Sequence, residues 1–481
     1  MTSASSSSGK PASAATVKKL ERALAQQRAA YHSLPNPDFK SRQHDLQQLE
    51  RFVRDHMEEI VQAISADYGH RSRHETLMTD IMPVLGTIAD ALKNLRTWMK
   101  PQKRAVDRVV FGMASNTVIP QPLGVIGVIV PWNFPLNLTL VPMAAIFAAG
   151  NRAMVKMSEN SRQLTRLLMD KMPAYLPPEK LQFFEETGGV GPAFSQLKFD
   201  HLLFTGSTAT GRSVMANAAG NLCPVTLELG GSSPAIIADD FSLKTAAERI
   251  LYVKYLNAGQ ICTTVNHVFV PRGKVAEFAK LAQDIVPQRY ASLDSPDYTS
   301  IIDDKAFQRI VGLLQDAKKR RAKVIQLIPG EPWNATTRKI APHIVIGASA
   351  NSDLMQQEIF GPVLPIVPYD DMSEVIDRIN AGSRPLALYP FSHNKAWVSH
   401  LLDHVMSGGV SVNDALLHVG QHDLPFGGVG ESGMGHYHGL EGFQNFSKLR
   451  PVFSQARVSA VKLLFPPYGL VADKMLAFLL R

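Results

Sequence analysis

The sequence predicts an α/β protein with a Rossmann-type domain followed by a second α/β domain. Three observations indicate this class. An uncharged, continuously apolar run at 124–130 is typical of a strand buried on both faces of a sheet. Short apolar runs and amphipathic helical runs then alternate in two successive blocks. The chain has 481 residues, 45% of them hydrophobic, which is enough for two or three domains with large cores.

Three helices are predicted before the first sheet, because apolar residues recur at helical spacing over 17–30, 44–66 and 76–99. The first block then places strands at 124–130, 152–157, 181–185 and 201–204, and helices at 138–149, 162–174 and after Gly206. This order predicts a parallel sheet of Rossmann type. Such a sheet permits dinucleotide binding without establishing it.

The second block predicts another α/β domain. Its strands are expected at 235–237, 267–270, 364–367, 386–389 and 409–412, and its helices at 243–256, 275–285, 373–379 and 395–404. Residues 1–16 are rich in Ser and Ala and lack an apolar stretch, so we expect a disordered tail rather than a signal peptide.

Charge and composition exclude several classes of function. The net charge is +8, but the basic run at 318–323 follows a helical stretch and contains no aromatic residue, which favours a helix C-terminus over a nucleic-acid site. The uncharged stretch 109–151 contains five prolines, so no membrane span is predicted there. The two cysteines, Cys223 and Cys262, are expected to be reduced, which fits a cytoplasmic protein.

Cys262 is the candidate nucleophile. It is flanked by small and polar residues and follows an expected tight turn at Gly259. A cysteine that serves only packing is more often found among Val, Leu and Ala. The setting of Cys262 therefore favours a reactive thiol, with a packing role as the alternative.

Two further residues carry groups that a covalent reaction needs. Asn133 lies between two prolines just after the first strand, and its amide is suited to holding an oxyanion. An Asx turn is the alternative role. Glu228 lies between leucines at the end of an apolar strand, where burial would raise its pKa and make it a usable base. A structural ion pair is the alternative for Glu228.

Several segments suggest cofactor contacts. Gly206 to Gly211 joins a strand to a helix, although it lacks the middle glycine of the dinucleotide fingerprint and also fits an ordinary helix cap. Glu159 follows the second strand, where an acid can accept hydrogen bonds from a ribose. His422, His436 and His438 are close in sequence but lack cysteine or acidic partners at ligand spacing, so no metal site is predicted.

Taken together, five segments resemble the aldehyde dehydrogenase superfamily and occur in the family's order: 131–135, 227–231, 259–263, 358–362 and 425–428. The segments 412–414 and 433–439 resemble the class-three branch, and within it the bacterial coniferyl aldehyde dehydrogenases. The sequence departs from the family's usual pattern at Met157, where proline is usual, and at Ser232, where lysine is common.

The resemblance implies that Cys262 attacks the aldehyde, that Asn133 holds the oxyanion and that Glu228 activates the water that releases the acid. It implies NAD as cofactor, with NADP as an alternative; Glu159 favours NAD because it would repel the 2′-phosphate of NADP. The implied cofactor contacts are Trp132, Lys156, Glu159, Gly206, Ser207, Gly211, Leu229, Glu358 and Phe360.

The resemblance also implies the domain organisation and a homodimer. An NAD-binding domain is expected at 17–108 and 121–228, a catalytic domain at 229–415, a return to the cofactor domain at 416–445, and an oligomerisation arm at 109–120 and 446–481. The expected substrate is an aromatic aldehyde such as coniferyl aldehyde, with a long- or medium-chain aliphatic aldehyde as the alternative. A CoA-acylating enzyme is disfavoured by Glu228, and a catalytically silent protein by the joint presence of Cys262, Glu228 and Asn133.

Overall fold

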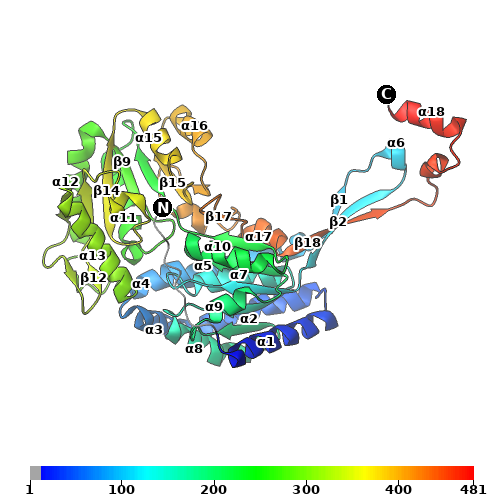
Figure 1. Ribbon diagram of the computed structural model, residues 1–481, viewed down its shortest axis with the longest axis horizontal. Coiled ribbons are helices and arrows are strands. Elements are labelled where there is room, and N and C mark those ends of the chain that lie inside the picture. Colours follow the sequence, from blue (N-terminus) through cyan, green and yellow to red (C-terminus); the bar gives the residue numbers. More distant parts are fainter. Residues whose placement is uncertain (1–11, 481) are drawn as a thin grey trace.

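The computed structural model describes residues 12–480. Two sheets, each covered by helices, form two neighbouring bodies, and a ribbon of three strands projects from them (Figure 1). The predicted α/β class, with a Rossmann-type sheet and a second α/β unit, is confirmed.

Helices dominate the segment before the first sheet. They are α1 (Ala14–Ser33), α2 (Phe39–Asp55), α3 (Met57–Tyr68), α4 (Arg73–Thr76) and α5 (Met82–Trp98), with a π-helical segment, Leu77–Ile81, between the last two. The prediction of one helix over 44–66 was wrong, because His56 leaves helical geometry at φ −115° and ψ 18° and separates α2 from α3. The predicted tail at 1–16 was too long: Ser13 caps α1, so residues 14–16 are helical, and residues 1–11 lie outside the described part.

The first sheet has the strand order β17-β7-β6-β3-β4-β5. Its parallel strands are β3 (Val125–Ile129), β4 (Arg152–Lys156), β5 (Leu181–Phe184), β6 (His201–Thr205) and β7 (Val225–Glu228), and β17 (Gly433–Met434) pairs with β7 in antiparallel fashion. The helices of this unit are α7 (Asn137–Ala148), α8 (Arg162–Lys171), α9 (Val190–Ser195) and α10 (Thr208–Ala219). The chain order reverses between β3 and β6, and the carboxyl ends of these strands mark the place where such sheets bind ligands.

The second sheet has the order β10-β13-β14-β9-β8-β15-β16, and all but β10 run parallel. Its strands are β8 (Pro234–Ile237), β9 (His267–Pro271), β10 (Lys323–Gln326), β13 (His343–Ile346), β14 (Val363–Tyr369), β15 (Ala387–Phe391) and β16 (Gly409–Val410). Its helices are α11 (Leu243–Tyr255), α12 (Val275–Arg289), α13 (Asp304–Lys319), α14 (Asp353–Gln356), α15 (Met372–Asn380) and α16 (Lys395–His404), and β11 (Trp333–Asn334) and β12 (Lys339–Ile340) form a small ribbon. The basic run follows the end of α13, as predicted.

The projecting arm is an antiparallel ribbon of β1 (Gln102–Arg104), β2 (Ser115–Pro122) and β18 (Ser447–Ser454). The short helix α6 (Arg108–Phe111) and the final helix α18 (Leu470–Leu479) lie at its far end, while α17 (Gly439–Asn445) remains with the main body (Figure 1). Apolar side chains are exposed along this arm, including Val109, Met113, Phe453, Phe465, Tyr468, Leu470 and Phe478. A search of the helices between residues 12 and 480 finds none that is long and apolar enough to cross a membrane.

Candidate active site

Two sheet edges converge on one site. Asn133 follows the carboxyl end of β3, and Glu228 is the last residue of β7. Cys262 and Glu358 precede β9 and β14, which are neighbouring strands of the second sheet. The carboxyl edge of the first sheet therefore faces the amino edge of the second, and residues far apart in sequence meet there.

The loop that carries Cys262 has an unusual backbone. Asn257 and Ala258 both have φ near 51°, and Gly259 has φ 75°. A Cβ atom at Gly259 would lie 2.4 Å from the Gly361 carbonyl oxygen, so glycine is required by the close approach as well as by the dihedral angle. The predicted turn at Gly259 thus brings the Cys262 loop against the segment that carries Glu358.

The environment of Cys262 disfavours the thiolate. Its side chain is half-buried, whereas Cys223, the other cysteine, is buried in the first unit. Burial of the sulfur, with smaller contributions from the carboxylates of Glu358 and Glu228, raises the pKa of Cys262 to about 12, although the backbone N–H groups of Cys262 and Thr263 act in the opposite direction. Both acids therefore lie close enough to the sulfur to influence its charge.

Glu228 is a buried acid without an ion pair. Its residue is 3% exposed, and neither carboxylate oxygen has a hydrogen-bond partner among the described residues. Burial raises its pKa well above the usual value. The structural ion pair considered as an alternative is therefore absent from this part of the chain. Gly427, in the loop before β17, approaches Glu228 so closely that a Cβ atom at Gly427 would lie 3.2 Å from Glu228 Oε1.

Asn133 is fixed by contacts to the Cys262 loop. Its Nδ2 donates to the Gln260 carbonyl oxygen at 3.3 Å, two residues before the cysteine. Within residues 12–480, Asn133 Oδ1 accepts no backbone hydrogen bond, so the Asx turn considered as an alternative is not formed there. One N–H of the amide is engaged by this bond, and the second remains available to a ligand.

Glu358 lies between the glycine pair that follows β7, Gly230 and Gly231, and the buried Lys254. A Cβ atom at Gly230 would lie 2.0 Å from Glu358 Oε2. Burial raises the pKa of Glu358 to about 7, and burial lowers the pKa of the fully buried Lys254, partly offset by Glu358. Within residues 12–480, Glu358 Oε1 is buried and without a hydrogen-bond partner.

Most of the predicted cofactor residues follow strands of the first sheet, whereas Glu358 and Phe360 precede β14 of the second sheet. Ser207 caps α10 by accepting from Thr210 N, so the helix-cap alternative describes a real interaction. Gly211 leaves room for Leu229, because a Cβ atom there would lie 2.6 Å from Leu229 Cδ2. Lys156 pairs with Glu186 at 2.8 Å, whereas Glu159 is exposed at the start of the loop before α8.

These residues fit a dinucleotide. Phe360, at φ 46°, packs edge-on against Trp132 with ring centroids 5.5 Å apart, next to the Glu358 segment. The unpartnered Glu358 oxygen is the acceptor that a ribose hydroxyl would satisfy. The close glycine contacts at Gly206 and Gly211 leave the loop before α10 without side chains that would block a phosphate.

Aromatic and imidazole side chains surround the other side of Cys262. Tyr389 donates its hydroxyl to the Thr263 carbonyl oxygen, and Tyr437 is fully buried beside Glu228 and Cys262. His438 stacks on Phe426 with ring centroids 5.2 Å apart. In the described range, no group of three or more His, Cys, Asp or Glu is arranged to hold a metal ion.

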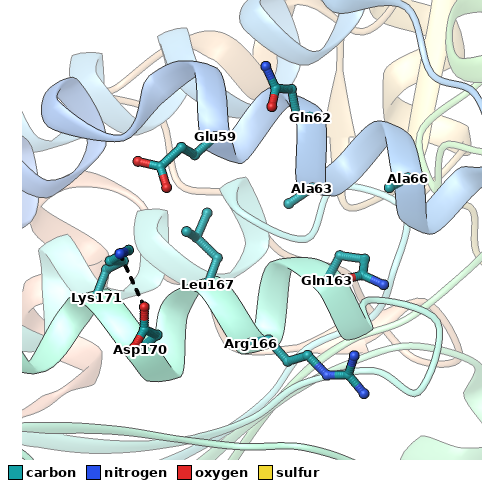
Figure 2. Close-up of a pocket in the computed structure, with 9 residues that line it drawn as sticks. All are labelled: Glu59, Gln62, Ala63, Ala66, Gln163, Arg166, Leu167, Asp170 and Lys171. Atoms are coloured by element: carbon teal, nitrogen blue, oxygen red, sulfur yellow. Dashed lines mark ion pairs between the residues drawn. The ribbon is translucent and has the colours of Figure 1, made fainter.

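A separate surface groove lies between α3 and α8 and contains none of the predicted site residues. Glu59 and Gln62 of α3 and Arg166 and Leu167 of α8 line this groove, with Leu167 pointing towards α3, and Lys171 pairs with Asp170 on the same helix (Figure 2). Its lining is that of an ordinary contact between two amphipathic helices, so the active site is assigned to the junction of the two sheets.

Four site residues were missed by the sequence analysis: Tyr68, Glu186, Lys254 and Asn257. Lys254 and Tyr68 lie on helices with an ordinary amphipathic pattern, and nothing local distinguishes them from residues that only pack. Asn257 lies five residues before the nucleophile Cys262, and that position was the available signal.

Two α/β sheets that meet at a cysteine, an amide and a buried carboxylate define a class of dinucleotide-dependent oxidoreductases. The model of the aldehyde dehydrogenase family matches residues 4–452. The chain is 45% identical over 460 residues to the probable coniferyl aldehyde dehydrogenase of Pseudomonas aeruginosa, which covers 95% of this chain and 96% of that protein. It is 38% identical over 448 residues to aldehyde dehydrogenase family 3 member A2 of Pongo abelii, covering 92% and 90%.

Among solved structures, the substrate-bound state of Staphylococcus aureus AldH matches with a TM-score of 0.90 and 30% identity, covering 96% of this chain and 99% of that one. This chain belongs to the aldehyde dehydrogenase family and is an aldehyde dehydrogenase. The family prediction, with its similarity to class-three and coniferyl aldehyde dehydrogenases, is confirmed.

Proposed function

We propose that this enzyme oxidises an aromatic aldehyde, such as coniferyl aldehyde, to its carboxylic acid through a covalent intermediate on Cys262. The observation that carries the proposal is the buried, unpartnered carboxylate of Glu228 beside the thiol. An acid with this environment has little structural value, because burying a carboxyl group without partners is costly. A role as a base in the reaction accounts for the burial of Glu228 beside the thiol.

The first step is attack of the Cys262 sulfur on the aldehyde carbon while its proton passes to solvent, which gives the oxyanion of a thiohemiacetal. The backbone N–H groups of Cys262 and Thr263 favour the thiolate. The free N–H of Asn133 and the backbone N–H of Cys262 are proposed to donate to the new oxyanion. Such donors act most strongly where water is excluded, and Asn133 is 4% exposed.

The second half of the reaction depends on Glu228. A dinucleotide held by Glu358 and Phe360 would supply the hydride acceptor, and loss of the hydride from the thiohemiacetal would leave the acyl group on Cys262 as a thioester. Glu228 then takes a proton from water, and the resulting hydroxide attacks the thioester carbon. The C–S bond breaks, the carboxylic acid leaves and the thiol is restored.

The proposed cofactor is NAD. Lys156, Glu159, Ser207 and Glu358 would hold it, with Glu358 and Phe360 on the nicotinamide side and Lys156 and Glu159 on the adenosine side. Glu159 is exposed, and its negative charge would disfavour the 2′-phosphate of NADP. Lys156 is already neutralised by Glu186 and offers little to counter that repulsion.

Aromatic substrate preference is supported by the side chains near the thiol. Tyr437, Phe426 and His438 form a group of ring contacts, and Tyr437 lies close to Cys262. The similarity to a probable coniferyl aldehyde dehydrogenase points the same way.

We further propose a cytoplasmic homodimer formed through the arm. Reduced thiols fit the cytoplasm, and the arm exposes apolar side chains that a second copy would cover.

A panel of aromatic and aliphatic aldehydes with NAD and NADP tests the proposal. We expect kcat/KM to be highest for coniferyl-type aldehydes with NAD, and Cys262→Ala to abolish NADH formation without loss of cofactor binding. Turnover that persists in Cys262→Ala would remove the thiol from the reaction, and a preference for aliphatic aldehydes would contradict the substrate assignment.

A further inference from the structure

A set of buried hydrogen bonds surrounds the backbone of Asn133. The Tyr68 hydroxyl donates to the Asn133 carbonyl oxygen at 2.9 Å. Asn257 Nδ2 lies within 3.3 Å of the same oxygen, 3.3 Å of the Tyr68 hydroxyl and 3.2 Å of the Gln260 carbonyl oxygen. Tyr68, Asn133, Asn257 and Gln260 are all buried. These hydrogen bonds join the four residues into one buried group, which we call the Asn133 clamp.

The Asn133 clamp joins three parts of the fold. Tyr68 is the last residue of α3, Asn133 follows β3, and Asn257 belongs to the strained loop before Cys262. The left-handed conformation of Asn257 is held in place by its N–H, which donates to Glu75 Oε1 at 3.0 Å. An asparagine tolerates this conformation better than most residues.

The clamp is fixed from its far side as well. Gln260 Nε2 donates to the Asn257 and Ser300 carbonyl oxygens at 3.0 Å each, and Gln260 Oε1 accepts from Ile302 N at 3.0 Å. Its backbone carbonyl therefore presents a stationary acceptor to Asn133 Nδ2.

A buried ion pair holds the residues that follow Asn133. Arg71 and Asp80 pair at 3.0 Å with both side chains fully buried, and Asp80 Oδ1 accepts from Leu136 N and Asn137 N at 3.0 Å each. The Arg71 guanidinium lies over the rings of Tyr68 and Phe134, 5.2 Å from each centroid. Rotation of the Asn133 segment would break these contacts together.

The consequence concerns the direction of one N–H bond. Asn133 has two amide hydrogens, and the Gln260 carbonyl engages one of them. With the backbone fixed by Tyr68 and Asn257, the second hydrogen has a defined direction before substrate arrives. Donors that are oriented in advance stabilise an oxyanion without reorganisation during the reaction.

We propose that Tyr68 and Asn257 are positioning residues that aim the Asn133 amide at the oxyanion, an inference that rests on the role proposed for Asn133 above. Neither residue touches the reacting carbon in this scheme. Tyr68 holds the Asn133 carbonyl, and Asn257 contacts both that carbonyl and the Gln260 carbonyl. The effect of removing either residue therefore depends on the presence of the Asn133 side chain.

A double-mutant cycle in the full-length enzyme tests this dependence. Tyr68→Phe removes only the hydroxyl, and the single-turnover rate of NADH formation at saturating aldehyde and NAD should fall about fivefold, equivalent to one net hydrogen bond. Asn133→Ala should lower that rate about a hundredfold. In the Asn133→Ala background, Tyr68→Phe should cause no further decrease. Asn257→Gly, which keeps the left-handed conformation accessible, should show the same dependence.

Tyr298→Phe is the matched control. The Tyr298 hydroxyl is also buried and donates to a backbone carbonyl, that of Ile340 at 2.6 Å, so the two variants lose the same group. Both should lower the melting temperature to a similar extent, but only Tyr68→Phe should slow NADH formation, and neither should change the dissociation constant for NAD.

The outcomes separate the two proposals. If the decreases caused by Tyr68→Phe and Asn133→Ala multiply in the double variant, or if Tyr68→Phe behaves like Tyr298→Phe, the positioning role is wrong while the oxyanion role of Asn133 stands. If Asn133→Ala alone leaves the rate unchanged, the oxyanion role proposed above is wrong, and the positioning role with it.

Discussion

Burial disfavours the charged forms of both the Glu228 carboxyl group and the Cys262 thiol. Burial raises the pKa of Glu228 well above its usual value, and burial together with the two nearby acids raises the pKa of Cys262 to about 12. A base must be ionised to accept a proton, so the high pKa of Glu228 limits it at low pH.

The raised pKa of Glu228 predicts how acid release depends on pH. Deprotonation of Glu228 increases with pH, so the deacylation rate should rise with pH, by up to tenfold per unit, for as long as the pH lies below its pKa. Rapid-quench measurement of thioester decay gives this rate directly. Glu228→Gln should have a low rate without that rise, and a rise that survives in Glu228→Gln would assign the base to another group.

The sequence predicted the residues that take part in the reaction better than the residues that hold them in place. Cys262, Asn133 and Glu228 stand in short segments whose residue types suggest chemistry on their own. Tyr68 and Lys254 lie on helices whose apolar spacing is satisfied by any buried side chain. Their importance comes from contacts with distant segments, which local patterns do not contain.

The loop before Cys262 is the element on which the site depends most. Three consecutive residues, Asn257 to Gly259, have positive φ, and Gly259 also approaches the Gly361 carbonyl oxygen. Because the turn brings two strand ends of the second sheet together, a change at Gly259 alters the position of both Cys262 and Glu358.

A pair of glycine substitutions tests this loop. Gly259→Ala places a Cβ atom in both a steric clash and an unfavourable dihedral angle, so the free energy of unfolding should fall by about 2 kcal/mol or more, and NADH formation should fall with it. Gly312 lies on the exposed face of α13 with nothing within 4 Å of an added Cβ atom. Gly312→Ala should raise stability by about 0.5–1 kcal/mol and leave activity unchanged. Equal effects of both variants in denaturant unfolding would contradict this account.

Most elements of the two sheets were predicted, since buried parallel strands and amphipathic helices have strong local patterns. The arm was predicted only through family resemblance. Its central pairing joins β2 to β18, more than 300 residues later in the chain, and β18 is largely exposed. The break at His56 also escaped prediction, because the apolar spacing continues from α2 into α3.

At the scale of the whole molecule, the arm exposes its apolar side chains far from the two sheets (Figure 1). Phe453 is 49% exposed and packs against Phe111 across the ribbon. An isolated ribbon of three strands has little core of its own, and a second copy of the chain would bury this surface.

We therefore expect the enzyme to have twice the chain mass of 52.8 kDa in size-exclusion chromatography with light scattering. Phe453→Asp should shift the population towards 52.8 kDa, because an unpaired charge would be buried at the interface. Met406→Asp is the control, since Met406 is 59% exposed and lies away from the arm. A monomeric wild-type enzyme, or a Phe453→Asp variant that remains fully dimeric, would contradict a dimer formed through this surface.

The meeting of two sheet edges is a property of the whole molecule that local sequence patterns did not predict. The alternation of strands and helices gave two units but not their relative placement. The relative placement of the two units was predicted only from the resemblance of the motifs, in their order along the chain, to the aldehyde dehydrogenase superfamily. The central claim is that a thiol from one sheet and a carboxylate from the other act on the same carbon.

That claim is tested most directly by mass spectrometry of Glu228→Gln incubated with coniferyl aldehyde and NAD. The account predicts an added acyl group that replaces one hydrogen, located on the peptide that contains Cys262 and absent when Cys262→Ala is combined with Glu228→Gln. An enzyme that forms NADH without such an adduct, or an adduct located on Cys223, would contradict it.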